Sequence, residues 1–118
     1  MIDYDTQLVD ALKTVLPTYE DRFVTSKTPM PCISYAENNN ADVATGDTIE
    51  YSRITYQITV WATEKKDLKK YARLVDKTLK PLGWGRISAG ELSDKLSAVR
   101  QKIMYYEALA LEDLEDEE

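Results

Sequence analysis

The most regular pattern in the chain is an alternation of apolar and polar residues between positions 49 and 62. Ile54, Tyr56, Ile58 and Val60 alternate there with Arg53, Thr55, Gln57 and Thr59. Because successive side chains of a strand point to opposite faces, the pattern predicts a long strand with one face on a core and the other facing water or a partner. A central strand of a parallel sheet would be apolar on both faces, so we expect an antiparallel or mixed sheet.

Two segments have apolar residues at helical spacing instead. Residues 5–16 are predicted to begin at a cap formed by Asp5 or Thr6 and to stop at Pro17. Residues 64–82 are predicted to begin at Thr63 and to close near Pro81 and Gly83. The apolar positions are Leu8, Leu12, Val15 and Leu16 in the first segment, and Leu68, Tyr71, Ala72, Val75, Leu79 and Leu82 in the second.

Four further segments are predicted to be strands. They are residues 22–25 (RFVT), 32–36 (CISYA, preceded by the rigid, extended TPMP), 84–92 and 95–109, the last two joined near Ser93 and Asp94. The alternation in 95–109 is imperfect, so a helix remains an alternative there. The element order predicts an α+β fold in which a mainly antiparallel sheet of four to five strands carries two helices on one face.

The link ENNNADVATGD, residues 37–47, is nearly all polar and longer than the two to five residues that usually close a hairpin. Asn38, Asn40, Asp42 and Asp47 supply oxygen ligands of the kind that calcium prefers. An EF-hand loop that starts at Asn38 would, however, need glycine at position 43 and glutamate at position 49, where valine and isoleucine stand. We therefore exclude calcium and predict a loop with a binding role, whose shortening by residues 38–44 should cost little stability.

The charge is unevenly distributed. The net charge is −6, but six of the 21 acids lie in EDLEDEE, residues 112–118, which leaves 15 acids against 15 bases before it. The chain length suits one domain, predicted to cover residues 1–111 and to be followed by an acidic, disordered tail at 112–118. An alternative is that the tail lies against a basic helix face of a neighbouring copy. No run approaches the roughly 18 apolar residues of a membrane span.

Residues that usually carry chemistry are scarce. Histidine is absent, which removes the usual general base and the commonest metal ligand. The stretch GWGRISAG lacks the Lys-Ser/Thr ending of a phosphate-binding loop. Cys32, the only cysteine, lies in an apolar run and is predicted to be a buried, inert thiol. We therefore expect no enzymatic activity, no catalytic residue, no metal and no cofactor.

Two surfaces are candidate binding sites. The second helix carries a basic face formed by Lys66, Lys69, Lys70, Arg73, Lys77 and Lys80. It is either a solvated face or a surface for phosphates or acids. The polar face of the long strand carries Tyr51, Arg53 and Trp61, which are typical of protein interfaces, although a second covering element of the same chain would also explain them.

Several motifs in Pro31–Arg86 resemble one protein family. In order they read PxISYxExNN, GD, IxYSxIxYxIxVW and LxxYAxxVDxxLxxLGWxR. This succession resembles the tail-completion or tail-terminator proteins, also called tail-to-head joining proteins, of long-tailed bacteriophages and of prophages in Gram-positive bacteria. The motifs cover about half of the chain and mark structural positions. The acidic end after Leu111 has no match in the family pattern.

The resemblance implies a non-catalytic virion assembly protein with an α+β fold. Such a protein acts in the virion tail, and in the host cytoplasm during assembly, as a hexameric ring that caps the tail tube and joins it to the head. Its partners would be its own copies, the tail tube protein and head-tail connector proteins, with nucleic acid only passing through the ring. The resemblance implies that the inter-strand loop contacts partners in the ring and that the strand from Tyr51 to Trp61 belongs to the core sheet. The predicted partner interface combines the loop residues Glu37, Asn38, Asn39, Asn40, Asp42 and Asp47 with Tyr51, Arg53 and Trp61, which the composition of the strand face suggested. Alternatives are another connector ring, or a nucleic-acid-binding module that uses the lysine-rich helix 64–82.

Overall fold

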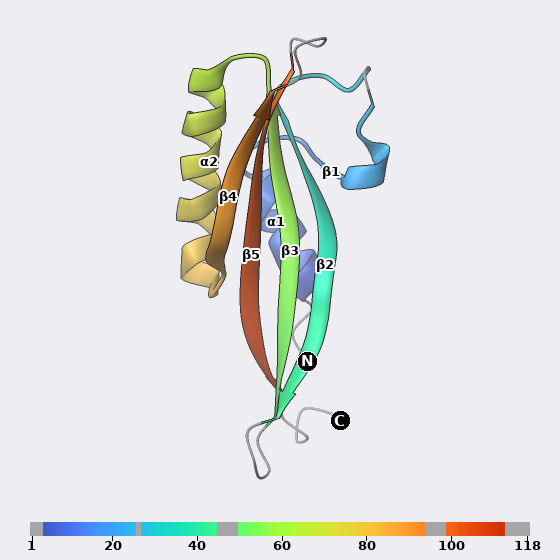
Figure 1. Cartoon of the computed structure of the whole chain (residues 1–118), viewed down its shortest axis with the longest axis vertical. Helices are drawn as coiled ribbons and strands as arrows, with labels where there is room; N and C mark the ends of the chain where they lie inside the picture. Colours follow the sequence, from blue (N-terminus) through green and yellow to red (C-terminus); the bar gives the residue numbers. More distant parts are fainter. Residues whose placement is uncertain (1–3, 26, 45–49, 94–98, 113–118) are drawn as a thin grey trace.

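The computed structural model describes residues 4–25, 27–44, 50–93 and 99–112. At the ends of several strands, including residues 38–44 and 50–53, it describes the backbone and not the side-chain environment. The elements in chain order are α1 (Tyr4–Lys13), β1 (Thr18–Glu20), the 3-10 turn η1 (Asp21–Phe23), β2 (Cys32–Ala44), β3 (Glu50–Ala62), α2 (Lys65–Leu79), the 3-10 turn η2 (Lys80–Leu82), β4 (Gly85–Ser93) and β5 (Arg100–Glu112). Figure 1 shows their arrangement.

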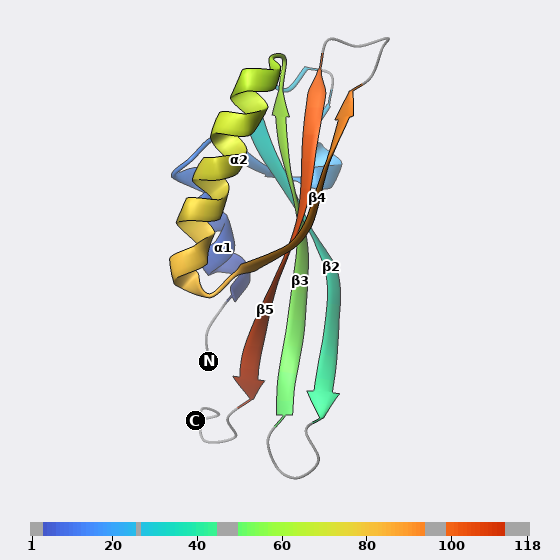
Figure 2. The same ribbon diagram turned by 60° about the vertical axis from the view of Figure 1, so that its left-hand side comes forward.

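The five strands form one sheet in the order β1-β2-β3-β5-β4. Only β1 and β2 are parallel, and the other three pairs are antiparallel. The long strand that the alternating residues predicted is confirmed as β3, which pairs with β2 on one side and with β5 on the other. Both helices lie on the same face of this sheet (Figure 2), so the predicted α+β architecture is confirmed.

The core lies between the helices and the sheet. Its fully buried members include Leu8 and Leu12 of α1, Leu68, Val75 and Leu79 of α2, and Ile33, Ile58, Val60, Met104 and Tyr106 of the sheet. Tyr56 and Trp84 meet edge to face within it, with ring centroids 5.6 Å apart. The apolar positions of the two helical patterns therefore form one cluster, with Val15 and Tyr71 packed at its edge, because each pattern supplies a single apolar stripe. Leu82 is the exception, since it lies in η2 and is 36% exposed.

The start of the chain differs from the prediction in its capping. The helix includes Asp5 and Thr6, so neither residue is the cap that we expected. Asp5 instead accepts a hydrogen bond of 2.5 Å from the Tyr56 hydroxyl and so ties α1 to the sheet. Burial and this hydrogen bond raise the pKa of Tyr56. The carboxylate satisfies a buried phenol here, a role that sequence spacing does not reveal.

The predicted strand at residues 22–25 is wrong. The strand β1 comes earlier, at Thr18–Glu20, and residues 21–23 form η1. Pro17 determines this start, because its carbonyl accepts the Ile33 backbone amide at 2.9 Å and so aligns the following residues beside β2. Phe23 remains 57% exposed and has no core to join, which explains why an apolar pair at 23–24 did not make a strand.

The predicted loop at residues 37–47 is largely wrong as well. The strand β2 continues through Ala44, and its backbone pairs with β3 from Asn39 opposite Thr55 to Ala44 opposite Glu50. A shift in register between Glu37 and Asn39 marks a bulge in the strand. The polar sequence is compatible with a strand because a β3 partner supplies its backbone hydrogen bonds whatever the side chains are. Asp47 lies outside the described residues.

The second half follows the sequence pattern more closely. Helix α2 starts at Lys65 after Glu64, not at Thr63, and ends through η2 at Gly83, whose φ of 92° suits glycine. Residues 100–112 are a strand, so the helical alternative is wrong. The expected connection at Asp94 and the tail at 113–118 lie outside the described residues, and Glu112 still belongs to β5.

The molecule is elongated. Its principal extents are 52, 25 and 24 Å, and its radius of gyration of 15.9 Å exceeds the roughly 13.5 Å of an average domain of this length. The length comes from the ends of β2, β3 and β5, which run past the helices (Figure 2). We call this three-stranded extension, residues 39–44, 50–55 and 107–112, the arm.

Candidate functional site

A hollow lies on the seam between α2 and strands β4 and β5, and we call it the seam pocket. It has a volume of about 290 Å³. Helix α2 contributes one wall because residues three and four apart share a helix face, and β4 and β5 contribute the other. The lining residues are Lys69, Ala72, Arg73, Asp76, Arg86 and Lys102.

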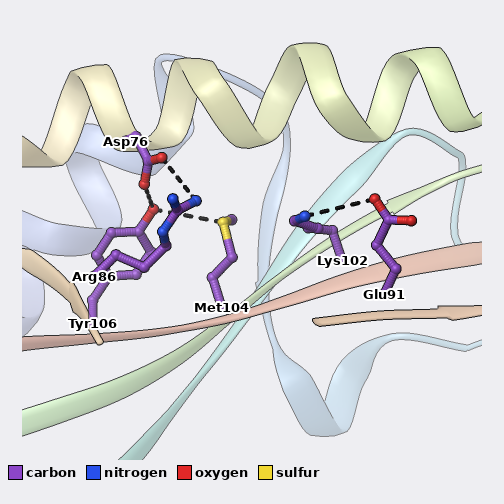
Figure 3. Close-up of polar contacts among 6 residues, drawn as sticks. All are labelled: Asp76, Arg86, Glu91, Lys102, Met104 and Tyr106. Carbon is purple, nitrogen blue, oxygen red and sulfur yellow. Dashed lines mark hydrogen bonds and ion pairs between the residues drawn. The ribbon is translucent and has the colours of Figure 1, made fainter. Parts of the chain in front are cut away.

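Asp76 organises one end of the seam pocket (Figure 3). One carboxylate oxygen accepts a hydrogen bond from the hydroxyl of Tyr106, and the other lies 2.9 Å from a terminal nitrogen of Arg86. Arg86 stands opposite Tyr106 in the β4–β5 register, which brings both groups to the same carboxylate. Asp76 therefore holds the Arg86 guanidinium in place while other donors of its five-donor fork remain for a ligand.

A second ion pair lies at the other end, where Lys102 Nζ is 3.6 Å from a Glu91 carboxylate oxygen (Figure 3). Lys69 and Arg73 are exposed and form no ion pair with any other residue in the described part of the chain. The pocket and its two ion pairs thus contain four cations, Lys69, Arg73, Arg86 and Lys102, against two carboxylates, Asp76 and Glu91. The excess of two positive charges suits an anionic ligand.

Burial and the bond to Asp76 raise the pKa of Tyr106, while Arg86 acts in the opposite direction. A phenol with a raised pKa in the folded state contributes stability that is present below its unfolded pKa of about 10 and is lost as pH rises above that value. We expect Tyr106→Phe to be less stable than the unmodified protein at pH 7 by about 1–3 kcal/mol, because a hydrogen bond to a carboxylate is lost. The difference should shrink above pH 10. Urea unfolding at pH 7, 10 and 11 measures this difference, and parallel curves for the two proteins would contradict the assignment.

The basic residues that the sequence predicted to share one face of the helix have different surroundings in the structure. Lys69 and Arg73 line the seam pocket. Lys66 pairs with Glu64 at 3.3 Å, and Lys70 lies over the Tyr71 ring, 5.2 Å from its centroid. Lys77 and Lys80 are exposed, without a place in the pocket. The predicted face is therefore two surfaces, of which only the part facing β4 and β5 has a concave site.

The predicted partner interface is spread over the arm and the sheet. Glu37 is exposed on β2, opposite Tyr56. The backbones of Asn38, Asn39, Asn40 and Asp42 belong to β2, and those of Tyr51 and Arg53 to β3, where Val43 pairs with Tyr51 and Ala41 with Arg53. These residues come together as paired strands of the arm, not as a loop beside a strand, and Trp61 lies toward the opposite end of β3. Their role in binding remains a prediction.

The polar face of β3 is more covered than an open surface would be. Thr55 and Thr59 are buried, and Trp61 is half-buried. The Trp61 indole donates a hydrogen bond of 2.9 Å to the Ser34 hydroxyl, which donates one of 2.8 Å to Asp21. Trp61 is therefore linked through Ser34 of β2 to Asp21 of η1 in the same chain.

Sequence analysis missed Arg86, Glu91 and Lys102 as site residues. Each stands in a strand whose charged residues looked like ordinary solvent-facing positions. Only for Lys102 was a signal available, because it shares its parity within β5 with the buried residues Met104 and Tyr106. A lysine in the same stripe as core residues must reach the edge of the core, beside whichever helix covers it.

The described residues give little sign of metal or nucleophilic chemistry. Cys32 is buried as predicted, and burial raises the pKa of its thiol to about 11. A thiol of this kind is a poor nucleophile at neutral pH. Within the described ranges there is no group of three or more Cys, Asp or Glu side chains arranged to hold a metal ion, and no helix is long and apolar enough to cross a membrane.

Comparison with known proteins gives a match of fold. No protein-family model matches the chain, and no curated protein matches it. Among solved structures, the chain is similar to a chain of the virion of a native gene transfer agent particle, with a TM-score of 0.65 and 14% sequence identity. The match covers 89% of this chain and 84% of the other. This protein therefore has the fold of a chain found in that virion.

Proposed function

We propose that this protein is a non-catalytic structural component of a phage-like virion, which forms a ring on the end of the tail tube and joins the tail to the head. The observation that carries the proposal is the fold similarity to a chain of the gene transfer agent virion over most of both chains. The motifs between Pro31 and Arg86 that resemble tail-completion proteins support the same class independently. Their resemblance to tail-completion proteins also supports the end of the tail as the proposed place of action.

A ring needs a surface that can contact a second copy, and β4 offers one. This strand forms an edge of the sheet, and its residues 85–91 are all exposed. Ile87 is 53% exposed at the irregularity between Arg86 and Ser88. An exposed edge strand presents unpaired backbone groups to another chain. When this edge contacts a different surface of the next copy, the contact is heterologous, and repeated contacts of this kind close into a ring when the rotation between copies permits.

The arm offers a second contact surface. It carries three strands beyond the region that the helices cover, so it can reach a neighbouring subunit or the tail tube without disturbing the core (Figure 2). Six of the predicted interface residues, Asn39, Asn40, Asp42, Tyr51, Arg53 and Asn38, lie in or beside it. We assign the arm to contact with virion partners and leave the core to fold stability.

The proposal is tested with purified protein and tail tubes that lack their terminal ring. Addition of the protein should cap the tube ends, stop further polymerisation and restore joining to DNA-filled heads, as seen by sedimentation and electron microscopy. Tubes that stay bare and continue to grow would overturn the tail-capping function. If electron microscopy finds the protein only on the heads and not on the tail tubes, the protein is another connector ring instead.

A further inference from the structure

We propose that the seam pocket binds the acidic segment of residues 113–118 of a second copy of this chain. The pocket has a surplus of cations, and this segment, DLEDEE, contains five carboxylates in six residues. This proposal rests on the proposed function, because it requires that copies of the protein associate in a ring. It adds that residues 113–118 of one copy bind the seam pocket of the next.

The cations that are left over make the pocket suitable for carboxylates. Lys69 and Arg73 stand one helical turn apart on α2 without an ion pair to any residue in the described ranges, so both are free to bind a ligand. Arg86 is held by Asp76, which orients a planar donor group toward the same hollow. Guanidinium groups match carboxylates in a two-point geometry, and Arg73 and Arg86 each supply such a group.

The two carboxylates of the site favour an acidic peptide over nucleic acid. Asp76 and Glu91 stand at the pocket, and each would repel a closely packed line of phosphates. Residues 1–111 carry 15 acids and 15 bases, so the field of the domain does not attract a polyanion from a distance either. A short segment with individually placed carboxylates can satisfy Lys69, Arg73 and Arg86 while it avoids both acids.

The length of the chain indicates that the segment comes from another copy. Lys102 of the pocket is ten residues before Glu112 on β5, which at about 3.3 Å per residue is roughly 33 Å along the strand. Six residues span at most about 20 Å when fully extended. Residues 113–118 of the same chain could at best come level with Tyr106, six residues before Glu112, and could not fill the pocket to Lys102. In Figure 2 the end of β5 lies well away from α2.

The test uses the full-length protein and a fluorescent peptide with the sequence of residues 109–118, at about 0.1 M salt, where the Debye length of about 10 Å screens charges outside the pocket. Peptide anisotropy should report saturable binding that weakens by at least about tenfold in the double variant Lys69→Glu/Arg73→Glu, because two charge-assisted contacts are lost and reversed. The matched control is Lys70→Glu/Lys77→Glu, which makes the same charge change on the same helix outside the pocket. It should bind within about threefold of the unmodified protein. Circular dichroism confirms that each variant is folded.

Three results would overturn the proposal. The first is an equal loss in the two double variants, which would assign binding to the general charge of the helix. The second is equal binding of a peptide in which every acid is replaced by its amide. The third is retention of a DNA duplex at the pocket that the peptide does not displace, which would assign the site to nucleic acid.

A complementation experiment tests the second copy. The pocket variant keeps its acidic segment, and a chain that lacks residues 113–118 keeps its pocket. Each protein alone should self-associate more weakly than the unmodified protein in sedimentation, and a mixture of the two should form a heterodimer. Self-association of either one alone at the level of the unmodified protein would refute the contact. Tail tubes capped normally by the pocket variant would refute only this contact and leave the proposed function intact.

Discussion

Replacing Leu68 with alanine should lower the free energy of unfolding by about 2–5 kcal/mol, because it removes a fully buried side chain from the core face of α2. Leu68 is 1% exposed and belongs to the main core cluster. The neighbouring atoms cannot collapse fully into the space that it leaves, so a cavity cost adds to the lost transfer free energy. Urea unfolding followed by tryptophan fluorescence measures the change, and Trp84 in the same core supplies a signal.

Leu74→Ala on the same helix is the matched control for this substitution. Leu74 is 38% exposed, so it loses little burial and should change the stability by less than about 1 kcal/mol. Both changes replace leucine with alanine in a helix, so intrinsic helix propensity cancels between them. Equal losses in the two variants would mean that the apolar stripe of α2 does not face the sheet as the structure has it.

The parts of the fold that the sequence predicted are those in which one periodicity dominates. The stripe of Leu68, Ala72, Val75 and Leu79 defines α2, and the alternation through Ile58 defines β3. Both patterns arise from burial on one side, and burial is the largest favourable term in folding. These elements needed no knowledge of their neighbours.

The errors fall where pairing, not burial, determines the structure. Residues 39–44 have only Ala41 and Val43 as alternating apolar positions, which is too short a pattern to predict a strand, yet they form one because β3 pairs with them. The strand β1 is three residues long and depends on β2 in the same way. The pattern of a single sequence does not predict backbone pairing of this kind, because the pairing depends on which other segment the fold places beside the strand.

The candidate site shows the same division. Lys69 and Arg73 stand out in the sequence because they share a helix with many other lysines. Arg86, Lys102 and Asp76 become a site only when β4 and β5 are placed beside α2, since each comes from a different element. Of the predicted basic face, only Lys69 and Arg73, which lie beside β4 and β5, line a pocket.

Deletion of Asn38–Ala44 is now expected to destabilise the protein, in contrast to the small effect that a loop would give. The deletion removes the β2 partner of β3 from Glu50 to Thr55. Each lost backbone hydrogen bond costs about 1 kcal/mol net, so a loss on the order of several kcal/mol should appear in thermal or urea unfolding. Melting close to that of the unmodified protein would show that the segment acts as a loop in solution.

A paired truncation separates stability from assembly. This variant removes Ala41–Arg53 and joins Asn40 to Ile54, which are already opposite each other, through an Asn-Gly turn. It leaves every remaining β2 and β3 residue paired and takes the β3 partner only from the last four residues of β5, Leu109 to Glu112, whereas the one-sided deletion takes the β2 partner from six residues of β3. It should therefore retain more stability than the one-sided deletion although it removes more residues. If the arm contacts virion partners, both truncations must fail to cap tail tubes, and a paired truncation that caps them normally would exclude the arm as the contact.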